Sequence, residues 1–307
     1  EGHRPLGVMV ENHEDSRPQS GISRADIVYE AVAEGGITRL LAIYYCQDGG
    51  TVGPVRSART YFLDFISEYG SNPLYTHVGG ANVPGPANAL GQIEDYGWGS
   101  YNDLNQFSIG FPTFWRDYER IGHAVATEHT MYSTAGKLWQ VAKDRDLTNV
   151  DKKGKEWDED FRQWKFKDDP GESDRGDVGS ISFPFWKGYG EYNVSWKYDK
   201  TSNIYQRESG GQSHTDLNNK EQLKAKNVVV VFMQERSLND AEKHLLYGTK
   251  GTGQATVFMD GKKITGTWEK KDREERMIIK DSKGKEIEFT RGNIWIEVLP
   301  QGTGVSS

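Results

Sequence analysis

One segment strongly restricts how this chain can fold, because residues 227–233 have the sequence NVVVVFM. Apolar side chains occupy both alternating sets of positions, so a strand formed here has no face suited to water. Strands of this kind lie inside a sheet, with other elements covering both faces. We therefore predict that residues 228–232 form an interior strand.

The second half of the sequence has the pattern of a β-rich region. The runs 192–198 and 204–207 flank a turn at residues 199–203, which predicts a hairpin. Further strand-like runs follow, with Asp260-Gly261 and Ser282-Lys283-Gly284 as turns between them. These runs are residues 254–259, 263–269, 275–279, 286–289 and 294–298. The pattern predicts an antiparallel meander.

The first half contains another candidate hairpin, formed by residues 25–34 and 37–45 around Gly35-Gly36. A glycine pair between two β-rich runs is typical of a tight turn. On this hairpin Glu30 and Glu34 would share one face, and Arg39 would lie just across the turn. Because Ala and Glu favour helix, a helix over residues 25–34 is the alternative.

An amphipathic helix is expected after the hairpin, over residues 60–70. Its apolar side chains recur with helical spacing at Phe62, Phe65, Ile66 and Tyr69. Ser57 is the expected N-cap, and Gly70 stands where a C-terminal glycine belongs.

Arg56 and Arg59 flank the expected start of this helix. A helix N-terminus already carries partial positive charge, so two guanidinium groups there need a compensating anion. The anion is either a ligand phosphate, sulfate or carboxylate, or an Asp or Glu of this chain. The sequence leaves both alternatives open.

Composition sets limits on the class of protein. Of the 307 residues only 35% are hydrophobic, but 12% are aromatic, and such large rings supply the core of a globular protein. A net charge of -7 without a dominant Lys/Arg run argues against nucleic acid as a partner. No apolar run approaches the length of a membrane-spanning helix.

Two further features bear on the compartment and on redox chemistry. Cys46 is the only cysteine, which excludes an intrachain disulfide, and its place in an apolar run predicts that it is buried. The sequence begins Glu1-Gly2-His3, which is not a natural start. We therefore expect that an N-terminal segment has been removed.

Charge density divides the chain into three regions. Residues 144–181 carry many charges of both signs and are expected to form a solvated connector, although its aromatic side chains indicate that parts of it dock. It separates an N-terminal region, residues 1–143, from a C-terminal region, residues 182–307. The expected fold class is α+β. We predict a mixed sheet with helices in the N-terminal half and an antiparallel, β-rich C-terminal half packed against it.

Several motifs together resemble those of one known family. They are the segments 25–30, 34–39, 52–59, 77–80, 129–133, 205–207, 214–216, 227–230, 266–268 and 295–298. The chain resembles the YerB-like lipoproteins of Gram-positive bacteria, a family filed as a domain of unknown function. It departs from the family pattern at His129-Thr130, where the family usually has His-Asn.

The resemblance spans nearly the whole chain except the connector. It implies an exported protein with an α+β fold, located outside the cytoplasm and anchored to the cell membrane through an N-terminal lipid. It implies no established activity, so any chemistry has to come from the residues themselves.

Polar side chains in these segments lie at expected strand ends and glycine turns, which tend to gather at one rim. We predict that Arg39, Arg56, Arg59 and His77 converge there with Glu34, and that His129 joins them. The expected ligand-binding residues are Thr38, Arg39, Arg56, Ser57, Arg59 and Arg116, and the candidate proton carriers are Glu34, His77 and His129. A buried ion-pair network of the same residues is the structural alternative.

Two functions from different classes remain open. The first is a binding module for an anionic small molecule or a cell-wall polymer. The second is an envelope hydrolase or transferase that acts on a cell-wall or phosphate-containing polymer, with Glu/His acid-base chemistry. A protein partner also stays open.

Other kinds of chemistry are disfavoured. No P-loop, dinucleotide fingerprint or G-x-S-x-G elbow is present, and we expect no cofactor. His77 and His129 with Glu34 or His214 could in principle hold zinc, but no HExxH or comparable spacing occurs, so we expect no metal. His214-Thr215-Asp216 is expected to cap a turn.

Overall fold

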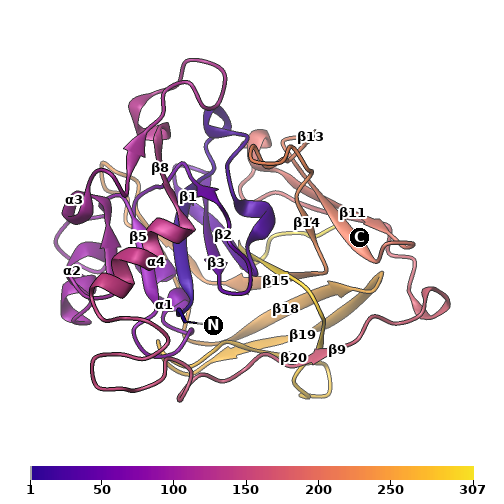
Figure 1. Ribbon diagram of the computed structural model, residues 1–307. Helices are drawn as coiled ribbons and strands as arrows, with labels where there is room; N and C mark the ends of the chain where they lie inside the picture. The colour runs from indigo at the N-terminus through magenta and orange to yellow at the C-terminus, as the bar shows by residue number, and fades with distance from the viewer. Residues whose placement is uncertain (1) are drawn as a thin grey trace.

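The apolar segment becomes strand β15 (Asn227–Met233) in the computed structural model, which describes residues 2–307 (Figure 1). Strand β15 lies between β18 (Gly251–Met259) and β22 (Ile294–Pro300), and the side chains of Val228 to Val231 are fully buried. The predicted interior strand is therefore confirmed. Glu1, with which the sequence begins, lies outside the described residues.

The glycine-pair hairpin is also present. Strands β2 (Ile27–Glu34) and β3 (Ile37–Tyr44) pair antiparallel, so the helical alternative for the first run is wrong. Strand β1 (Leu6–Glu11) pairs antiparallel with the other edge of β3. These three strands form the middle of the main sheet.

A β-bulge at the end of β2 changes which way its last side chain points. The register shifts between Val32 and Glu34, so that Glu34 pairs with Ile37. Side chains alternate between the faces of a strand, and one extra residue reverses that alternation. The prediction that Glu30 and Glu34 share a face is therefore wrong: Glu34 lies on the face of Arg39, and Glu30 lies on the opposite face.

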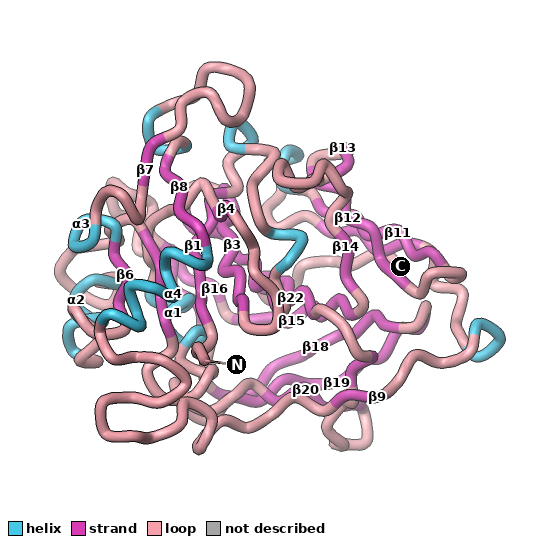
Figure 2. The backbone as a smooth tube through the Cα atoms, viewed as in Figure 1, coloured by secondary structure: helices cyan, strands magenta, loops and turns pink. Residues whose placement is uncertain are grey.

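Strands from both ends of the chain share one ten-stranded sheet, in the order β20-β19-β18-β15-β22-β2-β3-β1-β5-β6. Strand β22 runs parallel to both β15 and β2, and thereby joins the two halves of the sequence. Figure 2 labels β22 beside β15. The chain is mostly β with few helices (Figure 2). The expected division into a mixed N-terminal half and an antiparallel C-terminal half is not observed, because the C-terminal strands enter the mixed sheet. The remaining strands of this sheet are β5 (Leu74–His77), β6 (Asp103–Asn105), β19 (Lys262–Lys270) and β20 (Ile278–Asp281).

A five-stranded antiparallel sheet covers one face of the main sheet. Its strand β11 carries Trp196, whose ring meets Trp295 of β22 edge-on at 5.3 Å between centroids. The five strands are β10 (Ser180–Phe183), β11 (Val194–Asp199), β12 (Ile204–Ser209), β13 (Gln212–Ser213) and β14 (Lys224–Ala225). Short strands elsewhere are β4 (Thr51–Val52), β7 (Trp115–Arg116), β8 (Met131–Thr134), β9 (Phe166–Lys167), β16 (Glu235–Ser237), β17 (Leu245–Tyr247) and β21 (Phe289–Thr290).

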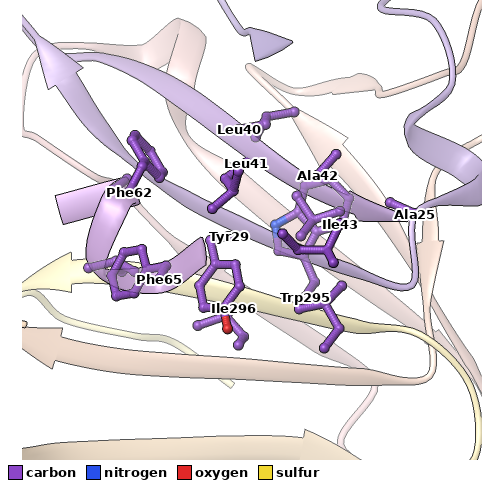
Figure 3. Packing of buried hydrophobic residues seen from close by; sticks show 14 of the residues in the cluster. Ala25, Tyr29, Leu40, Leu41, Ala42, Ile43, Phe62, Phe65, Trp295 and Ile296 are labelled. Atoms are coloured by element: carbon purple, nitrogen blue, oxygen red, sulfur yellow. The ribbon is translucent and has the colours of Figure 1, made fainter. Parts of the chain in front are cut away.

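Helix α1 (Thr60–Ile66) packs on the opposite face of the main sheet. Phe65 stacks on Tyr29 of β2 at 4.8 Å, and Phe62 lies beside it (Figure 3). Burying these rings fixes the helix on the sheet by the hydrophobic effect.

The other helices are α2 (Ala89–Asp95), α3 (Gln106–Ile109) and α4 (Ala135–Asp144), with 3-10 turns η1 (Glu14–Ser16), η2 (Ile22–Arg24), η3 (Thr127–His129), η4 (Glu172–Asp174) and η5 (Gly190–Tyr192). Across residues 2–307, no helix has both the length and the apolar character needed to cross a membrane.

Two local expectations from the sequence are wrong. The N-cap of α1 is Arg59 and not Ser57, because the backbone remains extended through Arg59. Cys46 is exposed, because β3 ends at Tyr44 and the chain has already entered a surface loop.

Candidate functional site

Two of the predicted arginines are held by one carboxylate. Glu34 accepts hydrogen bonds from Arg39 Nη2 at 2.7 Å and from Arg59 Nη2 at 2.5 Å. The Nη1 atoms donate to the backbone carbonyls of Ser57 and Ala58. Both arginine side chains are almost completely buried. This half of the predicted cluster is therefore an internal ion-pair network.

The same contacts determine the protonation state of Glu34. Burial alone would raise the pKa of this carboxyl, but the charges and hydrogen bonds of Arg39 and Arg59 outweigh it and lower the pKa to about 2. Glu34 is thus ionised throughout the neutral range. Such a carboxylate is poorly suited to the role of proton carrier.

Arg56 belongs to a second, more open group. Its Nε donates to Glu11 Oε2 at 2.5 Å, and Glu11 is buried at the end of β1. Burial raises the pKa of Glu11, but the charges of Arg39 and Arg56 prevail and lower it, so this carboxylate is also ionised. The Arg56 side chain is 26% exposed, and within residues 2–307 its Nη1 and Nη2 atoms have no hydrogen-bond partner. Arg56 can therefore still bind another group.

Arg56, Ser57 and Arg116 line one open pocket of about 670 Å³. The exposed Arg116 is held in place from strand β7, where its Nη1 donates to the Thr127 carbonyl at 2.6 Å and to Thr130 Oγ1 at 3.1 Å. The rest of the lining combines apolar groups with polar and glycine backbone. These residues are Val78, Gly79, Gly80, Leu90, Asn105, Phe107, Thr127, Glu128 and Met131.

His77 and Thr38 are not directed into this pocket. His77 is fully buried, with Nδ1 bonded to the Gly79 carbonyl and Nε2 to Asp103, each at 2.6 Å. Thr38 Oγ1 donates to Glu30 on the other face of the sheet. The structure thus brings together Arg39, Arg59 and Glu34 in one group and Arg56, Ser57 and Arg116 in another.

His129 lies beside the Arg56 group, as the sequence predicts. Its Nδ1 is 3.7 Å from Glu11 Oε2, and only 7% of the side chain is exposed. Burial lowers the pKa of His129, and the opposing effect of Glu11 is smaller, so the imidazole is neutral at pH 7. Its ring stacks on His13, a residue that the sequence analysis did not single out.

A separate buried network on the opposite face of the sheet also escaped the sequence analysis. Arg207 of β12 donates to Glu30 of β2 and, at 2.6 Å, to Glu297 of β22. Its guanidinium lies over the rings of Trp196 and Trp295, 5.1 and 4.4 Å from their centroids. A glutamate inside each of two otherwise apolar strands is the signal that could have revealed this network.

One arginine cannot neutralise two buried carboxylates. Burial, together with the neighbouring charge of Glu30, raises the pKa of Glu297 to about 8 despite the opposing charge of Arg207. Glu297 therefore holds a proton at neutral pH. This network fastens β12 to β2 and β22, and it lies in the core.

Comparison with known proteins identifies the family. Residues 1–148 match "Protein of unknown function (DUF3048) N-terminal domain", and residues 181–296 match the corresponding C-terminal domain. The chain belongs to this YerB-like family, as its motifs predicted.

The YerB protein of Bacillus subtilis extends this result, both in its sequence and in its crystal structure. The chain is 31% identical over 303 residues to "Putative lipoprotein YerB" of strain 168, covering 97% of this chain and 81% of that protein. The crystal structure of the YerB protein matches with a TM-score of 0.81 at 26% identity, covering 100% of this chain and 94% of the other.

Proposed function

We propose that this protein is an extracytoplasmic lipoprotein that binds an anionic ligand in the pocket of Arg56, Ser57 and Arg116. The observation that carries the proposal is Arg56 at the wall of an open pocket, where two of its guanidinium nitrogens have no partner among residues 2–307. A guanidinium fork of this kind matches the geometry of a phosphate or carboxylate.

The lipid anchor is proposed from the name of the relative, a putative lipoprotein. Fractionation of the native full-length protein, with analysis of its acylation, tests this part of the proposal.

The charges around the pocket favour an anion. The pocket lining carries two guanidinium groups, Arg56 and Arg116, against one carboxylate, Glu128. Arg39 and Arg59 are buried and paired, so they contribute to the local potential and do not touch the ligand. Direct contact falls to Arg56, Arg116 and the Ser57 hydroxyl.

The pocket also has an apolar side that suits a ligand larger than a simple ion. Phe107 is 75% exposed and lies against Gly79, and Leu90 and Met131 continue this wall. An aromatic ring at the edge of an anion site can pack against a sugar ring or an alkyl chain. We therefore propose a phosphate- or carboxylate-bearing envelope polymer as the ligand.

The contacts of the candidate proton carriers favour binding over catalysis. Glu34 is fixed between two arginines, and both nitrogens of His77 are already bonded to protein. General acid-base chemistry needs a side chain that can exchange a proton with the ligand. His129, the third candidate carrier, is buried beside the pocket and is not part of its lining.

Substitution of Arg116 tests the binding function with little risk to the fold, because this side chain is exposed. We expect Arg116→Gln and Arg56→Lys each to weaken binding of a glycerol-phosphate oligomer by at least about tenfold, since each removes a guanidinium fork. Isothermal titration calorimetry at low ionic strength measures the effect. Arg24→Gln, at an exposed arginine away from the pocket, is the matched control.

Two results would overturn the proposal. One is a wild-type protein that binds neither the oligomer nor inorganic phosphate at low salt. The other is an Arg116→Gln variant that binds as tightly as the Arg24→Gln control.

A further inference from the structure

Two histidines and one aspartate form a cluster beside the arginine pocket. One nitrogen each of His13 and His129 and one carboxylate oxygen of Asp15 lie within 4.8 Å of one another. His13 is the N-cap of η1, Asp15 follows within that turn, and His129 ends η3. Two segments far apart in the sequence therefore place three metal-ligand side chains at one point.

The Nδ1 atom of His129 gives the cluster a second, independent feature. It is buried and has no hydrogen-bond partner in the part of the chain that the structure describes. A buried polar atom without a partner costs about 1 to 3 kcal/mol, so such atoms are uncommon unless something binds them. Glu11 Oε2 lies 3.7 Å away and adds negative charge next to this nitrogen. The same oxygen also pairs with Arg56 at 2.5 Å, so the choice of ligand rests on the donor atoms of the cluster and not on a net negative charge.

We propose that His13, Asp15 and His129 bind a divalent transition-metal ion, with zinc as the best match to this donor set. Two imidazole nitrogens and a carboxylate are typical zinc ligands, whereas calcium and magnesium prefer oxygen alone. Three protein ligands leave one position of a tetrahedral ion for water or an external group. The inference stands whether or not the arginine pocket binds an anion.

Binding requires one local rearrangement. The rings of His13 and His129 are stacked 4.9 Å apart at 24°, and nitrogens of parallel rings do not point at a common centre. The His129 ring is buried, but the side chains of His13 and Asp15 are 28% and 62% exposed and can turn. His13 Nδ1 now accepts a hydrogen bond from the Asp15 backbone N–H at 3.2 Å. On metal binding this nitrogen would either bind the metal or take a different hydrogen bond that orients the ring.

Zinc titration of the whole protein tests the inference. After extraction with EDTA, the wild-type protein should bind one equivalent of Zn²⁺ in calorimetry, and Co²⁺ in its place should give the visible absorption of a tetrahedral site. His13→Gln and Asp15→Asn should each weaken Zn²⁺ binding by at least about tenfold, because loss even of outer-shell partners has effects of that size. Asp15 is exposed and His13 is partly exposed, so the variants should retain the wild-type circular dichroism spectrum.

An exposed histidine outside the cluster supplies the control. His123→Gln should bind Zn²⁺ like the wild type. The inference is overturned if the extracted wild-type protein binds no Zn²⁺, or if His13→Gln binds it as tightly as the wild type. A loss in His123→Gln equal to that in His13→Gln would show adventitious surface binding and would also overturn it.

Discussion

At the scale of single residues, Glu34 determines which of the predicted arginines remain available. The sequence placed Arg39 just across the turn from this glutamate, and the ion pair between them is present. The sequence could not show that Arg59 would occupy the second carboxylate oxygen, because that contact depends on where α1 packs. Nor could it show that Arg56 would pair with Glu11 through only one nitrogen. The residue types thus predicted that the arginines would cluster. Only the packing determines which of them are buried in ion pairs and which remain accessible to a ligand.

Replacing Glu34 tests its structural role. In Glu34→Gln, Arg39 and Arg59 stay buried but lose the carboxylate that both contact, and removing one partner of a buried pair typically costs about 3 to 5 kcal/mol. We expect a loss of this size in the free energy of unfolding, measured by urea denaturation at pH 7. Glu242→Gln, at an exposed glutamate, is the control and should change stability little. A Glu34→Gln variant as stable as this control would contradict the assignment.

The pKa of Glu34 gives this prediction a pH dependence. The pKa of about 2 in the folded protein lies below the ordinary value of 4.5, so the folded state favours the ionised form. The stabilisation is therefore complete above pH 4.5 and is lost as the pH falls toward 2. Wild type should lose stability over this range, and Glu34→Gln should lose less.

At the scale of elements, the sequence predicted those strands and hairpins that hydrophobic periodicity and turn residues specify. The hairpin β2–β3 and the interior strand β15 follow from the glycine pair and from the apolar run. The bulge in β2 has no such signal, because an extra residue shifts the register without changing the composition. The parallel pairing of β22 with β2 joins segments far apart in the chain, and no local pattern specifies it.

The buried network of Arg207, Glu30 and Glu297, which connects β12 to β2 and β22, should make stability depend on pH in the neutral range. The pKa of Glu297, about 8, lies above the ordinary value of 4.5, so the folded state favours the protonated form. Protonated Glu297 therefore adds its full contribution to the free energy of unfolding below pH 4.5. As the pH rises to 8, the free energy of unfolding should fall by about 2 to 4 kcal/mol. In Glu297→Gln, which is neutral and of similar shape, that decline should disappear. Urea denaturation between pH 5 and 8 measures it.

A neighbouring glutamate provides the comparison for this experiment. Glu208 on β12 pairs with Lys197 near the surface, so Glu208→Gln should keep the wild-type decline. An undiminished decline in Glu297→Gln would show that the buried carboxylate is not its source.

At the scale of the whole molecule, the shared sheet predicts a single cooperative unit. A fragment of residues 1–180 lacks β15 and β22, so residues Ile27 to Glu30 of β2 lose the strand with which they pair. We expect this fragment to show no sharp thermal transition by circular dichroism, whereas the intact chain unfolds in one step. A fragment that melts cooperatively near the temperature of the intact protein would exclude this interpretation.

The position of β22 also has a consequence for the order of events during synthesis. Its partner β2 leaves the ribosome long before β22 exists, on the order of 10 to 50 s earlier at about 5 to 20 residues per second. Throughout that interval the N-terminal strands present an open, apolar edge of the kind that invites aggregation. We therefore expect the nascent chain to need protection of this edge until the strand that closes the sheet arrives.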